Sequence, residues 1–225
     1  MPTATRTLHG AALAALKGCD PRLAAVIDQV GPYQPAKRGD GFAALVRAIV
    51  SQQVSKYAAE AILGRVHALF RDGRPEPLAL LALPRRRLVA AGLSRRKVDY
   101  LRDLAAHVAD GRLDLARLRR LPDEAVVESL TAVKGIGRWT AEMYLIFTLG
   151  RPDVVPLGDA ALLAAVRELY GLPAEADGEH FDAIAATWRP WRSIACWYLY
   201  RSINLRREAK AAERAAAGRG AWSSL

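Results

Sequence analysis

The sequence predicts an all-α fold. After Phe42, apolar residues recur at the three- and four-residue spacing of an amphipathic helix, at Leu45, Val46, Ile49 and Val50. No segment of useful length alternates apolar and polar residues in the manner of a half-buried β-strand. Glycines and prolines separate the helical segments, as expected for turns between helices.

Residues that are typical of helix starts and ends predict where the individual helices lie. Asp20 followed by Pro21 is typical of a helix start, and this helix is expected to stop at Gly31. The loop Pro32–Gly41 holds two prolines and two glycines and marks a boundary between lobes. Further helices follow the same signals, over about 42–50 and 56–70, within 77–111, from 122 to the hairpin, from 138, over about 160–170, up to about 188 and over about 190–216. We expect two helical lobes, one of residues 39–150 and one of residues 1–38 plus 151–225.

The composition limits the class of protein. The 225 residues are 52% hydrophobic and 25% charged, with a net charge of +10 and a pI near 10.0. Such a chain attracts polyanions, either nucleic acid or an anionic membrane surface, although arginine enrichment can also reflect a bias in composition. No run approaches the roughly 18 apolar residues of a membrane span, and no signal peptide is recognised. With two cysteines, Cys19 and Cys196, the chain lacks the ligands for a four-cysteine zinc site or iron–sulfur cluster, and a reducing cytoplasm is the expected setting.

Two glycines lie at the centre of the segment Leu130–Phe147, LTAVKGIGRWTAEMYLIF. Gly135 and Gly137 flank Ile136 between two helical runs, the second of which begins at Arg138. Glycine tolerates the backbone angles of a tight turn, and the isoleucine would fill the space between the helices. The first amides of the second helix would suit a phosphate. From the residues alone, this segment is either a helix–helix turn without a ligand or an anion-binding hairpin.

The residues around the turn narrow this choice. K-G-I-G-R-W-T-A resembles the hairpin of the helix-hairpin-helix (HhH-GPD) superfamily of DNA base-excision glycosylases, and the Trp after the Arg resembles its 3-methyladenine DNA glycosylase II branch. The resemblance covers about residues 20–205 and implies a two-lobe helical fold with the active site in the cleft between lobes, without the N-terminal β domain of some relatives. The W-R-P-W-R-S segment, residues 188–193, matches a family signature that we expect to pack the catalytic lobe. The resemblance also implies that the hairpin binds the DNA backbone through Lys134, Gly135, Ile136, Gly137 and Arg138.

Asp159 is the candidate catalytic residue. It precedes an apolar helical run, so helix capping is the interpretation that the residues alone favour. The segment V-V-P-L-G-D-A-A-L is similar to the family's proline-containing loop with its catalytic aspartate, and this resemblance assigns Asp159 to catalysis as well. A carboxylate at a helix start is stabilised as the anion. It would stabilise a sugar cation resembling an oxocarbenium ion and orient or deprotonate the attacking water.

The resemblance further assigns a base pocket to Trp139, Met143 and Tyr200. Bifunctional relatives carry a lysine where this chain has Trp139, so the enzyme is expected to be monofunctional and to leave an abasic site. An indole face also attracts the positive charge of an alkylated purine. Packing in the core remains the alternative for Trp139 and Tyr200. Met143 and Ala160 replace aromatic residues of the best-studied branch, which leaves the range of lesions open.

The polar segment Ser51–Ser55 separates two helical patterns. From the residues alone it is a solvated connection. By resemblance, Gln53 enters the DNA and fills the gap left by an extruded nucleotide. Farther along the chain, Arg95, Arg96 and Lys97 crowd positive charge at a helix start, where a DNA phosphate would balance it.

The expected function is that of a base-excision repair glycosylase, which flips and hydrolytically releases alkylated purines such as 3-methyladenine. The expected partner is double-stranded DNA containing damaged bases, bound by a cytoplasmic or nucleoid-associated monomer with no membrane partner. No cofactor or iron–sulfur cluster is expected, apart from a Na⁺ or K⁺ ion that the backbone carbonyls of Thr131, Val133 and Ile136 would bind. The alternatives are a non-catalytic helix-hairpin-helix DNA-binding module and a bifunctional glycosylase/lyase.

Overall fold

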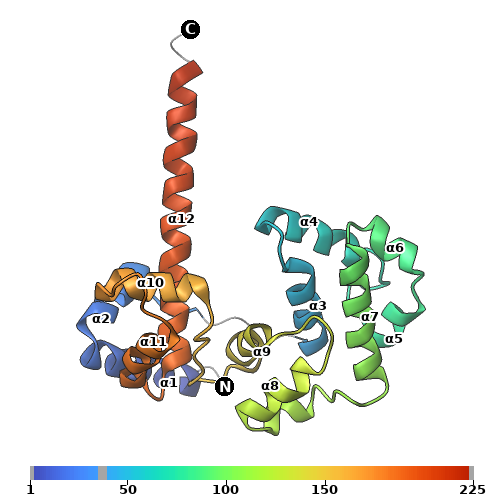
Figure 1. The fold of residues 1–225 in the computed structure, drawn as a ribbon, viewed down its shortest axis with the longest axis horizontal. Coiled ribbons are helices and arrows are strands. Elements are labelled where there is room, and N and C mark those ends of the chain that lie inside the picture. The colour runs from blue at the N-terminus through green and yellow to red at the C-terminus, as the bar shows by residue number, and fades with distance from the viewer. Residues whose placement is uncertain (1–2, 35–39, 223–225) are drawn as a thin grey trace. The chain divides into compact units, whose positions relative to one another are not determined.

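The computed structural model describes residues 3–34 and 40–222. Within these ranges the chain forms α-helices joined by turns and by short 3-10 and π-helical segments, and it contains no β-strand (Figure 1). The predicted all-α fold is confirmed. Among the described residues, no helix combines the length and the apolar character needed to cross a membrane.

The helices form two compact units. The first unit combines Met1–Pro35 with Arg151–Leu225, and the second unit consists of Ala36–Gly150. The predicted boundary between residues 38 and 39 falls outside the described residues. The other junction follows Gly150, whose left-handed backbone, with φ 71°, ends the π-helical segment η2 (Leu145–Leu149).

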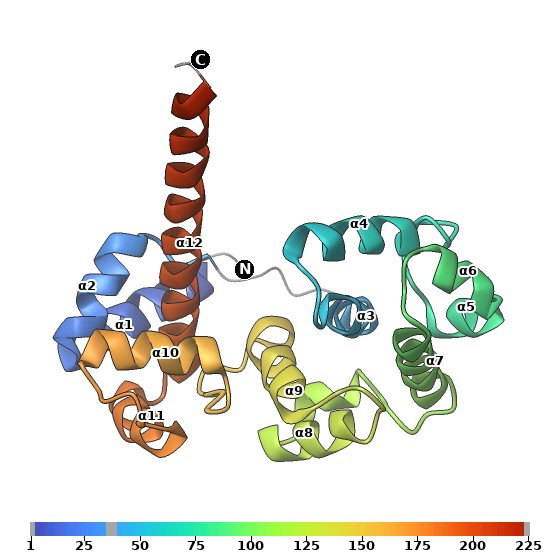
Figure 2. The ribbon, with the colours of Figure 1, turned by 45° about the horizontal axis from the view of Figure 1, so that its top comes forward.

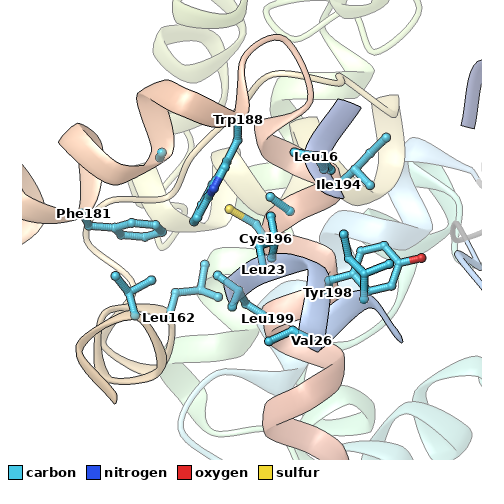
Figure 3. Close-up of a cluster of buried hydrophobic side chains, with 14 of the residues drawn as sticks. Leu16, Leu23, Val26, Leu162, Phe181, Trp188, Ile194, Cys196, Tyr198 and Leu199 are labelled. Atoms are coloured by element: carbon cyan, nitrogen blue, oxygen red, sulfur yellow. The ribbon is translucent and has the colours of Figure 1, made fainter. Parts of the chain in front are cut away.

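The first unit is built from both ends of the chain. Its elements are α1 (Thr3–Cys19), α2 (Pro21–Val30), α10 (Ala160–Tyr170), α11 (Gly178–Ala185), the 3-10 segment η3 (Ala186–Trp188) and α12 (Arg192–Trp222). Figure 3 shows its core, in which Trp188, Phe181 and Cys196 lie among leucines of α1, α2, α10 and α12. No helix is predicted before Asp20, whereas α1 occupies that segment. Its residues Ala12 and Leu16 lie about one turn apart and are buried in this core, which favours the helical form.

Asp20 connects three elements of the first unit. Its Oδ1 accepts the Leu23 N–H at 2.9 Å, which is the predicted cap of α2, and its Oδ2 accepts the Trp188 Nε1–H at 2.7 Å. The Tyr170 hydroxyl donates to the same Oδ2. Burial by itself raises the pKa of Asp20, but the hydrogen bonds from the Leu23 backbone, Tyr170 and Trp188 outweigh it and lower the pKa below the ordinary value. Trp188 is fully buried, as the packing role predicted for the W-R-P-W-R-S segment requires of it.

Helix α12 is longer than predicted, because it ends at Trp222 and not near Ala216. Its first turns contribute Ile194, Cys196 and Leu199 to the core. The described side chains farther along, up to residue 213, are mostly exposed, and the helix continues beyond the rest of the first unit (Figures 1 and 2). Alanine, lysine, arginine and glutamate predominate there, and their high helix propensity favours continuation without a buried face.

The second unit contains the remaining helices of the described chain. They are α3 (Gly41–Ser51), α4 (Lys56–His67), α5 (Pro77–Ala82), α6 (Arg85–Ala90), α7 (Arg95–Ala109), the 3-10 segment η1 (Arg117–Arg120), α8 (Asp123–Thr131), α9 (Arg138–Tyr144) and η2. The apolar face predicted for α3 is buried. Helix α4 ends before the predicted Phe70, because the Leu69 and Phe70 N–H groups bond to carbonyls three residues back and tighten the chain.

Candidate active site and nucleic-acid interface

Asp159 is the N-cap of α10 and is almost completely buried, with 6% of its surface exposed. Its Oδ1 accepts the N–H groups of Ala161 and Leu162, each at 2.8 Å, so the helix cap predicted from the sequence is present. The loop before it is also held, since the Asp159 N–H donates to the Pro156 carbonyl at 3.0 Å. The backbone of its own loop and helix therefore fixes the orientation of this carboxylate.

The other carboxylate oxygen of Asp159 has a side-chain partner. The hydroxyl of Tyr200, on α12, donates a hydrogen bond to Asp159 Oδ2 at 2.7 Å. Figure 2 shows α10 beside α12 within the first unit, which brings the two residues together. Such a donor stabilises and orients negative charge on the oxygen that accepts it. The resemblance assigns Tyr200 to a base pocket, whereas the structure adds a direct contact with the candidate catalytic carboxylate.

The glycine hairpin joins α8 to α9 in the second unit (Figure 1). Gly135 has a φ of 83°, a left-handed conformation that favours glycine, and the Ile136 N–H donates to the Val133 carbonyl at 3.1 Å. Ile136 is buried, as predicted, and Gly137 is the extended N-cap of α9. The N–H groups in the first turn of α9 point along the helix axis, out of its N-terminal end.

Helix α7 supports the hairpin. The ring of Tyr100 lies directly against Gly135, where an added Cβ would overlap it. The side chain of Asp103 accepts the Lys134 N–H at 2.8 Å. The Arg96 guanidinium lies over the Tyr100 ring, 5.4 Å from its centroid. The long-range contacts of Tyr100 and Asp103 fix the backbone of the turn, and no pattern in the sequence predicts them.

A hollow of about 920 Å³ lies beside the hairpin within the second unit. Its walls come from the end of α3 and the segment after it, the start of α7, the hairpin and α9. The predicted site residues that line it are Gln53, Gly135, Ile136, Gly137, Trp139 and Met143. Trp139 is 48% exposed, so the alternative that it is a core residue is wrong. An aromatic ring in the wall of such a hollow offers a face for a planar base.

Gln53, the predicted wedge, is exposed and adopts a left-handed backbone with φ 55°. Its neighbour Gln52 donates from Nε2 to the Gly135 carbonyl at 2.8 Å. The Lys97 ammonium group donates to the carbonyls of Val50 and Gln52 at 2.7 and 2.6 Å. Gln52 is not among the residues predicted from the sequence, and a phosphate is the predicted partner of Lys97. The structure places backbone carbonyls there instead.

Arg138, predicted to contact DNA, forms an ion pair with Glu124. The Nη1 atom lies 3.2 Å from Oε2 of Glu124, and Nη2 donates to the other carboxylate oxygen. The hydrogen bond raises the pKa of the Arg138 guanidinium and lowers the pKa of the Glu124 carboxyl group. Both side chains are exposed, so solvent and salt screen the pair. A DNA phosphate that binds Arg138 would compete with Glu124.

The helix, glycine turn and second helix make this chain a helix-hairpin-helix protein. Residues 46–190 match the model of the HhH-GPD superfamily of base excision DNA repair proteins. The chain belongs to this superfamily. In the described part of the chain, no group of three His, Cys, Asp or Glu side chains is arranged to hold a metal ion.

Individual relatives and solved structures agree with this family. DNA-3-methyladenine glycosylase 1 of Schizosaccharomyces pombe is 33% identical over 195 residues, which cover 84% of this chain and 86% of the yeast protein. The crystal structure of a DNA-3-methyladenine glycosidase from Bacillus halodurans is 38% identical, with a TM-score of 0.77 over 88% of this chain and 91% of that one. An S. pombe 3-methyladenine DNA glycosylase in complex with abasic DNA is 33% identical, with a TM-score of 0.77 over 84% and 95% of the two chains.

Proposed function

We propose that the protein is a monofunctional DNA glycosylase, which hydrolyses the N-glycosidic bond of alkylated purines such as 3-methyladenine and leaves an abasic site. The observation that carries the proposal is the buried Asp159 carboxylate, held by two backbone N–H groups and the Tyr200 hydroxyl. The relatives named as 3-methyladenine glycosylases support this class of substrate.

Asp159 has the charge and orientation that the reaction requires. As the bond between the sugar C1′ and the base nitrogen breaks, the base leaves with the bonding electrons and positive charge develops on the sugar. A fixed carboxylate stabilises that charge without reorganising during the reaction. It also accepts a proton from the water whose oxygen bonds to C1′. Because an alkylated purine already carries positive charge, it leaves as a neutral base and needs no protonation.

Trp139 determines the proposed reaction subtype. An indole cannot form a Schiff base with the sugar, so strand cleavage by a lyase route has no nucleophile at this position. A cationic purine over the indole face gains about 0.5 to 2 kcal/mol. Met143, in the same hollow, offers a polarizable surface without the specificity of a second aromatic ring. We therefore assign both residues to base recognition.

DNA binding is assigned to the second unit. The hairpin backbone from Gly135 to Gly137 and the side chain of Lys134 would bind a DNA phosphate, since helix N-terminal amides and cations are the groups that bind phosphate. Gln53 would fill the space of the flipped nucleotide and offset part of the few kcal/mol that flipping costs. The protein would act on damaged double-stranded DNA as a monomer, in the cytoplasm or on the nucleoid.

A monovalent cation is part of this proposal. Family resemblance implies a Na⁺ or K⁺ ion bound by the carbonyls of Thr131, Val133 and Ile136, which would bridge the hairpin and a phosphate. Backbone carbonyls are suitable ligands for such ions. The Val133 carbonyl accepts the Ile136 N–H, and a carbonyl oxygen keeps a second lone pair for an ion.

The test is base release by the full-length protein from duplex DNA carrying methylated, etheno or deaminated bases. The proposal predicts release of 3-methyladenine or another alkylpurine, with abasic sites and no strand cleavage. Absence of release from every alkylated substrate would favour a binding module. A covalent protein–DNA adduct trapped by borohydride would instead establish the lyase alternative.

A further inference from the structure

The Lys97 ammonium group occupies the C-terminal end of α3. It donates to the carbonyl of Val50, in the last turn of that helix, at 2.7 Å, and to the carbonyl of Gln52, just after it, at 2.6 Å. A helix leaves its last carbonyls without internal partners, and these carry partial negative charge. The carbonyls thus balance the positive charge that Lys97 places in the first turn of α7. Partial burial lowers the pKa of Lys97, in keeping with an ammonium group withdrawn from water.

The segment held in this way leads directly to Gln53. This residue is the single non-glycine with positive φ in the described part of the chain, at 55°. A left-handed backbone is unfavourable for a residue with a side chain and persists where its surroundings impose it. Lys97 binds the carbonyl of Gln52, which belongs to the peptide bond between Gln52 and Gln53. This hydrogen bond supplies such a constraint on the backbone of Gln53.

The same segment is tied to the hairpin. Gln52 Nε2 donates to the Gly135 carbonyl at 2.8 Å, while α7 contacts the hairpin through Tyr100 and Asp103. Lys97, the Gln53 segment and the hairpin line one hollow. The same set of contacts therefore holds Lys97, the Gln53 segment and the hairpin together.

We infer that Lys97 is a positioning residue, which sets the backbone of Gln53 for insertion into DNA and does not itself bind a phosphate. This inference rests on the proposed function, because it assumes that Gln53 is the wedge. Loss of the ammonium group would release the Gln52 carbonyl and allow Gln53 to leave its left-handed conformation. Nucleotide flipping would then slow, whereas attraction of the protein to undamaged DNA would change little.

The test compares four single variants and one double variant of the full-length protein, after thermal unfolding has shown that each is folded. Lys97→Met removes the ammonium group but keeps the length of the side chain, and Lys97→Arg keeps two donors for the carbonyls. Arg86→Met is the matched control, since it removes one positive charge from the exposed start of the neighbouring helix α6. Gln53→Ala removes the wedge, alone and combined with Lys97→Met. The readouts are the single-turnover rate of alkylpurine release, the fluorescence of 2-aminopurine beside the lesion, and the salt dependence of binding to undamaged duplex.

We expect Lys97→Met to slow base release and the fluorescence change about tenfold, as Gln53→Ala does, with the double variant no slower than either single one. Lys97→Arg should recover most of the rate, and Arg86→Met should release base within about twofold of the wild type. A wild-type rate for Lys97→Met, or additive losses in the double variant, would overturn the inference. So would a shallower salt dependence in Lys97→Met with normal fluorescence, because that result identifies a phosphate contact. If Gln53→Ala itself reacts at the wild-type rate, the proposed wedge fails, and the positioning role fails with it.

Discussion

The hydroxyl of Tyr200 donates a hydrogen bond to Asp159 Oδ2 at 2.7 Å, while Oδ1 of the same carboxylate caps α10. The two oxygens therefore have separate tasks. One is held by the helix backbone, and the other is oriented by a side chain from α12. In the proposed function, Tyr200 would thus position this carboxylate, in addition to its predicted place in the base pocket.

Tyr200→Phe should slow single-turnover base release about 10- to 150-fold, since a hydrogen bond to a charged group contributes about 1.5 to 3 kcal/mol. Tyr198→Phe is the matched control on the same helix, because its hydroxyl donates to the Gly31 carbonyl at 3.1 Å, away from Asp159. Both substitutions remove one hydroxyl, so both can lower thermal stability. Equal rates for the two variants would show that the contact with Asp159 does not assist the reaction.

Trp139→Leu should affect charged and neutral lesions differently. Loss of the indole face should slow release of cationic 7-methylguanine or 3-methyladenine about 2- to 30-fold, which corresponds to a cation–π energy of about 0.5 to 2 kcal/mol. Release of a neutral damaged base, such as hypoxanthine, should change less if the wild type accepts it. The measurement is the ratio of the variant rate to the wild-type rate on two oligonucleotides that differ only in the damaged base. The same loss for both kinds of base would assign Trp139 to shape alone.

Gly135→Ala should destabilise the second unit. The residue has a φ of 83°, and a Cβ would overlap the Tyr100 ring, so the strain of about 1 to 2 kcal/mol for a left-handed alanine adds to a steric clash. Gly137→Ala is the comparison, because φ there is −94° and no atom lies within 4 Å of the added Cβ. Chemical denaturation should therefore show a clear loss for Gly135→Ala and a small change for Gly137→Ala. Equal stabilities would contradict the close packing of the turn on α7.

Asp20→Asn should lower the free energy of unfolding by about 1 to 3 kcal/mol at neutral pH, because the Asp20 carboxylate accepts hydrogen bonds from Leu23, Tyr170 and Trp188. The folded-state pKa of Asp20 is below its ordinary value of 3.8. The stabilisation by the ionised group is thus present above pH 3.8 and is lost as the pH falls through the folded-state pKa. Below pH 3.8, the difference in free energy of unfolding between the wild type and Asp20→Asn should therefore shrink.

Asp40→Asn provides the control for the acid titration. Asp40 also caps a helix, accepting the Phe42 N–H at 2.9 Å, and asparagine caps about equally well. Its variant should unfold with nearly the wild-type free energy, because the exposed ion pair of Asp40 with Arg74 contributes little. A pH-independent difference for Asp20→Asn would contradict the charge-based account.

Local signals in the sequence predict much of the fold. The Asp20–Pro21 start, the Asp159 cap and the bounds of α10 all depend on residues within one or two turns of each other. Helix α1 was missed because its burial depends on packing against the next helix, α2, and against the distant segment η3. Helix α12 continues past its predicted end and through Gly218 and Gly220, which helix propensity does not predict.

The sequence predicted which residues belong to the candidate site, but not the contacts that hold them in place. Resemblance singled out Gln53, Trp139 and Asp159, but no local pattern could reveal what holds them. Lys97 reaches carbonyls more than forty positions away, and Tyr200 reaches a carboxylate forty-one positions away. Such contacts depend on how helices pack, which sequence periodicity does not specify.

The central claim is that the charge of Asp159 drives hydrolysis. Asp159→Asn keeps an oxygen for the Ala161 and Leu162 N–H groups, so the cap of α10 and the thermal stability should be retained. The decisive measurement is the single-turnover rate of 3-methyladenine release by this variant, with binding to abasic-site DNA measured in parallel. We predict a loss of at least about 100-fold in rate with binding near the wild-type level. Release at the wild-type rate by a folded, DNA-binding Asp159→Asn protein would contradict the account.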